Sequence, residues 1–145
     1  MTAHLGPILL DTGALVHLTR DDAVGKRIAS EHKLRDRTDK PLVCIITVGE
    51  LLTMARRNAW GQAKVDQMMA LLRETIVVDL RAQPILDKYA ELQVFLGKGK
   101  VIQQNDVWIA ATAAATGALI LTTDKDFDRL YPKYIQRAWY DPKGR

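Results

Sequence analysis

The sequence predicts an α/β protein in which helices cover both faces of a mainly parallel sheet, giving a three-layer α/β/α sandwich. Short runs that are apolar throughout alternate with longer stretches of helical pattern. Strands of that kind are typical of a parallel sheet buried on both faces. The chain has 145 residues, 48% of them hydrophobic, and no repeat or linker divides it. We therefore expect one domain spanning residues 1–145, with one hydrophobic core.

Four apolar runs are the expected strands. The first is expected to end in a turn at Thr12-Gly13, because Asp11 comes directly before it and Gly13 is part of it, and both residue types favour turns. The strands, in chain order, are expected at Pro7–Asp11, Leu42–Ile46, Thr75–Asp79 and Ala118–Leu121.

Helical spacing of apolar residues fills the segments between the later strands. Thr47 is a suitable N-cap for the first of these helices. Asn105 or Asp106 opens the last, which is rich in alanine, and Gly117 ends it. The expected helices cover Val48–Arg57, Gly61–Arg73, Gln83–Leu96 and the stretch from Asp106 to Thr116.

Composition and charge exclude several classes of protein. No apolar run approaches the roughly 18 residues of a membrane span, and the first residues lack the basic and apolar regions of a signal peptide. The single cysteine, Cys44, lies in an expected strand, where a buried thiol is the simplest reading. We expect a cytoplasmic protein. The formal net charge of +4 is weak evidence for a polyanionic partner.

Four acidic residues are expected at the carboxyl edge of the sheet, where α/β proteins collect functional groups. Asp11 ends the first strand, Asp124 follows the fourth, Glu50 lies in the first turn after the second, and Asp106 opens the alanine-rich helix. Carboxylates gathered there repel one another unless cations neutralise them, and hard oxygen ligands suit Mg²⁺ or Mn²⁺. Such ions can activate water and stabilise a leaving oxygen in phosphodiester hydrolysis.

Each acid also has an ordinary structural explanation when it is taken alone. Asp11 fits a turn, Glu50 and Asp106 fit acids that stabilise the start of a helix, and Asp124 fits a solvated loop. Only their joint placement favours a cation site.

Four segments resemble the signature blocks of PIN-domain ribonucleases, most closely the VapC-like toxins of toxin–antitoxin pairs. They occur in the family's order and extend over residues 8 to 127. The blocks are Ile8-Leu-Leu-Asp-Thr-Gly-Ala14, Thr47-Val-Gly-Glu-Leu51, Asn105-Asp-Val-Trp-Ile-Ala-Ala111 and Leu121-Thr-Thr-Asp-Lys-Asp-Phe127.

The resemblance implies a five-stranded sheet and a Mg²⁺- or Mn²⁺-dependent endoribonuclease acting on structured RNA, such as tRNA or ribosomal RNA. It also implies a cognate antitoxin and a homodimer. By motif position the catalytic and metal-binding acids are Asp11, Glu50, Asp106 and Asp124, with Asp126 as a fifth ligand. Thr12, Thr122 and Asn105 would line the site.

An RNA substrate also requires basic residues near the acids. The candidates, each of which is also an ordinary solvated charge, are Arg56, Arg57, Lys98, Lys100 and Lys125. Trp108 could stack on a base, although packing is the simpler role on so apolar a helix.

Other readings have less support. Leu9–Ala14 also resembles the aspartic-protease signature, but those folds are almost wholly β. A haloacid-dehalogenase-type phosphatase needs an aspartate where Gly13 stands, and the histidines lack zinc-ligand spacing. The alternative that stays open is a PIN-like module that binds RNA or protein without cleaving.

Overall fold

The computed structural model describes residues 6–99 and 102–145 and contains one five-stranded sheet with the strand order β3-β2-β1-β4-β5. Every pairing in this sheet is parallel. The strands are β1 (Ile8–Leu10), β2 (Leu42–Cys44), β3 (Ile76–Val78), β4 (Leu119–Thr122) and β5 (Gln136–Trp139). The prediction of a mainly parallel sheet is confirmed, and the five strands implied by the family resemblance are present.

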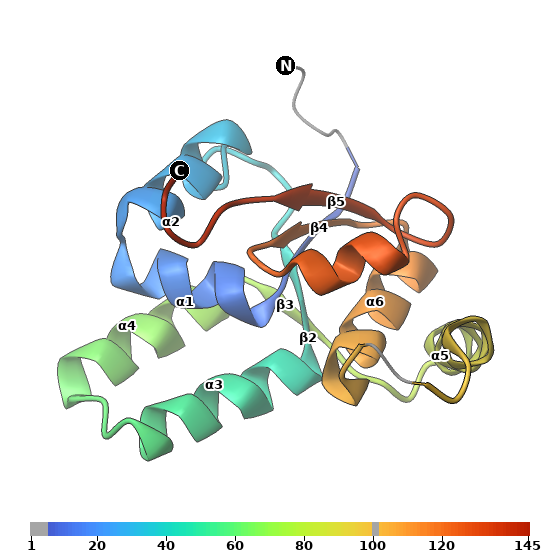
Figure 1. Ribbon diagram of the computed structural model, residues 1–145. Helices are drawn as coiled ribbons and strands as arrows, with labels where there is room; N and C mark the ends of the chain where they lie inside the picture. Colours follow the sequence, from blue (N-terminus) through green and yellow to red (C-terminus); the bar gives the residue numbers. More distant parts are fainter. Residues whose placement is uncertain (1–5, 100–101) are drawn as a thin grey trace.

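In the described part of the chain, six α-helices and one 3-10 helix cover the two faces of the sheet (Figure 1). On one face pack α1 (Thr12–Arg20), α2 (Ala23–Glu31), α3 (Ile45–Arg57) and α4 (Gln62–Arg73). On the other pack α5 (Gln83–Leu96), α6 (Gln104–Thr116) and η1 (Lys125–Arg129). This arrangement confirms the three-layer sandwich.

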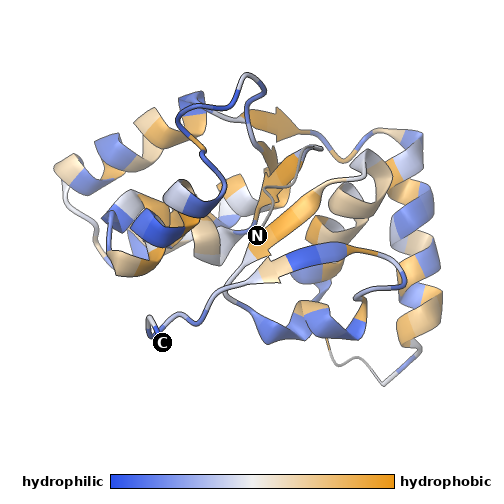
Figure 2. Ribbon diagram, turned by 90° about the horizontal axis from the view of Figure 1, so that it is seen from above, coloured by the Kyte–Doolittle hydropathy of each residue, from blue (hydrophilic) through white to orange (hydrophobic). Residues whose placement is uncertain are grey.

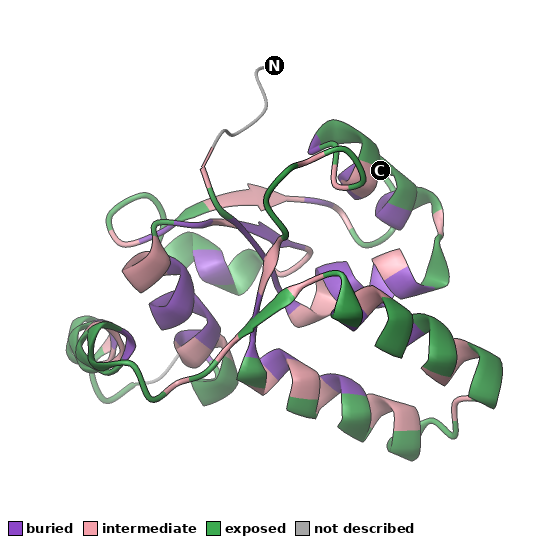
Figure 3. Cartoon of the chain, turned by 180° about the vertical axis from the view of Figure 1, so that it is seen from behind, coloured by how far each residue is buried: buried purple, intermediate pink, exposed green. Residues whose placement is uncertain are grey.

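The alternation of side chains along the strands divides the core into two halves. In β1, Leu9 faces α5 and α6, whereas Ile8 and Leu10 face the opposite layer. In β2, likewise, Cys44 faces the layer of α5 and α6, and Val43 faces the opposite layer. The central strands β1, β2 and β4 are strongly hydrophobic in Figure 2 and mostly buried in Figure 3, whereas the edge strands β3 and β5 are exposed or only partly buried. Cys44 is fully buried, as expected.

Two helices precede β2 where no helix had been assigned. The turn expected at Thr12-Gly13 is wrong, because Asp11 caps α1, which runs on to Arg20. Asp22 then caps α2 by accepting the N–H of Gly25 at 2.9 Å. Aspartate followed by glycine suits a turn and a helix N-cap equally, so the local sequence does not distinguish them.

The start of α3 also differs from the prediction. The helix begins at Ile45 rather than Val48, Cys44 rather than Thr47 is its N-cap, and Thr47 is fully buried inside it. β2 accordingly stops at Cys44. Ile45, Ile46 and Thr47 are β-branched and favour strands locally, but tertiary packing places them in the helix. Within the described ranges, no helix is long and apolar enough to cross a bilayer.

Candidate metal centre

Asp11 lies where β1 meets β4 at the carboxyl edge of the sheet. Its Oδ1 accepts the N–H of Ala14 at 2.8 Å, and its Oδ2 accepts the hydroxyl of Thr122. The Thr122 oxygen accepts the N–H of Asp124 at 2.8 Å. Thr122 therefore connects the residues that follow the two strands.

The topology makes this junction the natural binding crevice of the sheet. The chain leaves β1 toward β2 on one side, and β4 toward β5 on the other. A sheet binds ligands at the carboxyl ends of neighbouring strands whose connections diverge in this way. Asp11 and Asp124 stand at that point.

Glu50 reaches the same edge from α3. The prediction that it lies in the first turn is wrong, because α3 starts earlier and Glu50 is its sixth residue. Its Oε1 accepts the hydroxyl of Thr12 at 2.6 Å, and its Oε2 accepts the amide of Asn105 at 3.4 Å. Thr12 Oγ1 also lies 3.1 Å from Thr47 Oγ1. Thr12 and Asn105 therefore hold the Glu50 carboxylate from both sides.

Asp106, Asp124 and Asp126 form the tightest acidic group. Each offers one carboxylate oxygen, and these oxygens all lie within 4.8 Å of one another. Asp106 is in the first turn of α6. Asp124 caps η1 and accepts the N–H of Asp126 at 2.8 Å. All of them share a pocket of about 270 Å³ with Asp11 and Glu50.

Three further residues line this pocket although they were not singled out from the sequence: Gly13, Gln103 and Thr123. A Cβ at Gly13 would stand 2.3 Å from the hydroxyl oxygen of Thr123. The close approach of these two segments explains the glycine after Asp11-Thr12, and that glycine was the available signal.

The carboxylates of this pocket disfavour one another's ionised form. Burial raises the pKa of Asp11 from 3.8 to about 7, and the charges of Asp124 and Glu50 act in the same direction. Hydrogen bonds from Thr122 and Ala14 oppose the increase. Burial also raises the pKa of Asp106 to about 7, again with the neighbouring carboxylates adding to the effect. The cation-free pocket therefore holds protons near neutral pH.

A pH-dependent stability follows from these two values. The unfolded chain releases its aspartate protons near pH 4, so between about pH 4 and 7 the cation-free folded protein binds more protons than the unfolded one. Its free energy of unfolding should therefore fall as the pH rises through this window. Urea titrations in EDTA at pH 5.5 and 8 measure this difference. A higher midpoint at pH 8 would contradict the origin assigned here to the two raised pKa values.

The donor set fits a hard divalent cation. Every converging side chain offers carboxylate oxygen, and the nearby hydroxyls and amide leave no soft ligand in the pocket. Without a counter-charge, carboxyl groups of this cluster bind protons near neutral pH.

The predicted RNA-binding residues are placed unevenly. Arg57 lines a groove beside Glu50. Arg56 is exposed at the end of α3, and Lys98 is exposed just after α5. The ammonium of Lys125 lies over the Trp139 ring, 4.6 Å from its centroid. Lys100 lies outside the described residues.

Trp108 stacks on Tyr89 with ring centroids 3.5 Å apart, so the predicted packing role is the one that its contacts show.

The fold and the pocket define this chain as a three-layer α/β/α protein with an acidic pocket at its switch point, and comparison with known proteins agrees with that fold. The family model of the PIN domain matches residues 8–132. The chain belongs to the PIN-domain family.

Three individual proteins illustrate the similarity in sequence and in fold. Ribonuclease VapC5 of Mycobacterium tuberculosis is 28% identical over 97 residues, which cover 63% of this chain and 70% of that protein. The VapBC2 structure from Rickettsia felis, bound to a promoter DNA fragment, superposes with a TM-score of 0.77 at 20% identity, covering 92% of this chain and 98% of that one. VapC20 of M. tuberculosis, described as a Sarcin-Ricin loop cleaving toxin, gives 0.64 at 18% identity, covering 86% and 95%.

Proposed function

We propose that this chain is a Mg²⁺- or Mn²⁺-dependent endoribonuclease that hydrolyses phosphodiester bonds in structured RNA, and the toxin of a toxin–antitoxin pair. The observation that carries the proposal is the convergence of five carboxylates from four segments of the chain on one pocket. Burial and the neighbouring carboxylates raise the pKa values of Asp11 and Asp106, which supports a counter-charge in that pocket. The whole chain carries a formal net charge of +4 with these acids included, which suits a polyanionic substrate.

Asp106, Asp124 and Asp126 would hold the cation, with Asp11 and Glu50 completing the ligand set. When bound, divalent cations supply the charge that activates water and stabilises the leaving oxygen of a phosphodiester. Thr122 and the N–H of Ala14 orient Asp11. Thr12 and Asn105 orient Glu50, which would hold a cation or orient the attacking water.

The relatives support the proposed substrate and an antitoxin partner. The printed names of VapC5, a ribonuclease, and VapC20, a toxin that cleaves the Sarcin-Ricin loop, support structured RNA, tRNA or ribosomal RNA, as the substrate class. Several similar structures are VapBC toxin–antitoxin complexes. On that basis we propose a protein antitoxin. From the family resemblance we also propose a homodimer and a cytoplasmic location, and from the absence of a linker a single domain over residues 1–145.

Cleavage assays test this function directly. Purified protein is incubated with tRNA and ribosomal RNA in Mg²⁺, in Mn²⁺ and in EDTA. We expect discrete fragments with either cation and none in EDTA, with activity restored when the cation is added back. Saturable RNA binding without cleavage under every condition would favour the non-cleaving binding module instead.

A further inference from the structure

Lys125 is a cation placed between two acids of the candidate metal centre. It separates Asp124 from Asp126 in the sequence and begins η1. Its side chain is exposed, and a lysine has a flexible four-carbon stem that can bring the ammonium to neighbouring carboxylates. Among the described residues, however, Lys125 forms no ion pair with either acid or with any other. Something else must hold its ammonium away from them.

The ammonium of Lys125 lies over the ring of Trp139, 4.6 Å from the centroid. Trp139 is the last residue of β5 and is in register with Thr122 of β4, whose hydroxyl connects β1 and β4 at the acidic pocket. Its neighbour Ala138 packs with the layer of α1 to α4. Because side chains alternate along a strand, Trp139 faces the layer that contains η1. The ring therefore lies close to the acidic pocket, on the side of η1.

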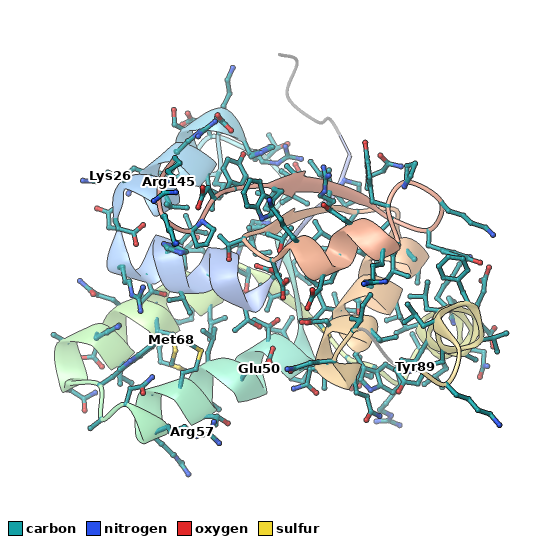
Figure 4. All side chains as sticks on the ribbon, viewed as in Figure 1. Lys26, Glu50, Arg57, Met68, Tyr89 and Arg145 are labelled. Atoms are coloured by element: carbon teal, nitrogen blue, oxygen red, sulfur yellow. The ribbon has the colours of Figure 1, made fainter. Side chains whose placement is uncertain are left out.

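This contact is on the side of the pocket away from α3. Figure 4 labels Glu50, which reaches the pocket from α3, and η1 and β5 lie on the opposite side of it. An ammonium that left the ring would therefore approach the pocket from the side of Asp124 and Asp126. With Asp106, these are the acids whose carboxylate oxygens lie closest together.

A hydrogen bond does not explain the tryptophan at position 139. Within the described part of the chain, its Nε1–H is buried and has no hydrogen-bond partner. A leucine would fill the space without leaving a buried donor unpaired. What tryptophan adds is a ring face that attracts a cation more strongly than that of tyrosine or phenylalanine. The residue type therefore agrees with the geometry in assigning Trp139 to its contact with Lys125.

The other favourable place for this ammonium is the acidic pocket itself. A cation–π contact and an ion pair at exposed sites are similar in strength, so a well-placed ring is sufficient to hold a lysine that has carboxylates within reach. An ammonium inside the pocket would neutralise the same carboxylates as a divalent cation. The two would therefore compete.

We propose that Trp139 is a positioning residue that holds the Lys125 ammonium at the rim of the acidic pocket and so leaves Asp124 and Asp126 available to a divalent cation. Loss of the ring would release the ammonium toward these carboxylates, where it would compete with the cation. Trp139 acts through Lys125 in this arrangement and does not bind the cation itself. This inference rests on the proposed metal centre and specifies how the chain keeps its own positive charge out of it.

Calorimetric titration with Mn²⁺ at pH 8 tests this role in Trp139→Leu, Lys125→Met and the double variant. Trp139→Leu should weaken Mn²⁺ affinity by about 5-fold, the effect of one competing ion pair. Lys125→Met keeps most of the stem and removes the charge, so it should bind Mn²⁺ as tightly as the unmodified protein or more tightly. The double variant should match Lys125→Met, because the ring then has no ammonium to hold.

Trp60→Leu is the matched control. Trp60 has a similar contact with Lys64, whose ammonium lies 3.9 Å from the ring centroid, and it does not line the acidic pocket. This control should leave Mn²⁺ affinity unchanged. Trp139→Phe keeps an aromatic face and should weaken the affinity less than Trp139→Leu does. It also supplies the measurement if the leucine variant does not fold.

Equal Mn²⁺ affinity in Trp139→Leu and the unmodified protein would overturn the role of Trp139 while leaving the proposed ribonuclease function intact. A loss of affinity that persists in the double variant would show that Trp139 acts through packing, and would also overturn it. Absence of saturable Mn²⁺ binding in the unmodified protein would instead overturn the proposed metal centre, and this inference with it.

Discussion

Asp11→Asn is expected to reduce Mg²⁺-dependent RNA cleavage by about 100-fold or more, and at the same time to stabilise the cation-free protein. The substitution removes a carboxyl group whose pKa is raised to about 7 by burial. An asparagine oxygen can still accept the N–H of Ala14, so the cap of α1 is retained. Thr122 Oγ1 can accept from the new amide as well as from the N–H of Asp124.

The gain in stability should be about 1–3 kcal/mol at pH 8, where the native carboxylate is ionised, and should shrink toward pH 5.5. Cleavage rates and urea midpoints of the same preparation measure both effects. Asp87→Asn is the matched control, because Asp87 is exposed and accepts only a local hydrogen bond from Gln83. If Asp11→Asn cleaves RNA at the native rate, the assignment of this residue to the cation site is wrong.

Gly25→Ala should destabilise the protein by about 2 kcal/mol or more, because overpacking against rigid backbone forces the helices apart. An added Cβ would lie 2.2 Å from the carbonyl oxygen of His17 and 2.7 Å from its carbonyl carbon. These are backbone atoms of α1, so no side-chain rotation relieves the contact. Gly25 is what allows α2 to pack directly on α1.

Gly49→Ala provides the contrasting case, since it also changes a helical glycine but its Cβ meets open space. It should stabilise the fold by about 0.5–1 kcal/mol, the difference in helix propensity. Thermal or urea unfolding of the two variants decides the matter. Equal stability of both would show that the close contact between α1 and α2 is not energetically important.

The sequence was most informative where a pattern extends over many residues. The helix Gln83–Leu96 was predicted with the bounds that the structure has, since its apolar spacing continues for several turns and Gly97 ends it. Four of the strands were located for the same reason, although β1, β2 and β3 are shorter than their apolar runs and β4 is shifted by one residue.

Predictions that depended on a single cap were less successful. Asp11-Thr12-Gly13 suits a turn or a helix start, and Thr47 suits an N-cap, yet Thr47 is buried within α3. What decides between these possibilities is packing against distant segments, such as the contact of Thr12 with Glu50. β5 could not be assigned from its own residues, because this edge strand is only partly buried and carries no continuous apolar run.

The acids were located from their positions at strand and helix ends, whereas the distances between their carboxylates could not be predicted from the sequence. The structure groups Asp126 with Asp106 and Asp124, although the family resemblance implied it only as a fifth ligand. The η1 turn brings these residues together, and no pattern in the sequence predicts its geometry. The basic residues were the hardest to place, since only the fold shows that Arg57 faces the groove beside Glu50.

Mn²⁺ binding is the most direct test of the claim that this acidic cluster is a cation site. The measurement is a calorimetric titration at pH 8, comparing the unmodified protein with Asp106→Asn. We predict saturable binding that Asp106→Asn weakens by about 10-fold or more, and that weakens as the pH falls below 7. Absence of saturable binding, or equal affinity in the two proteins, would contradict the account.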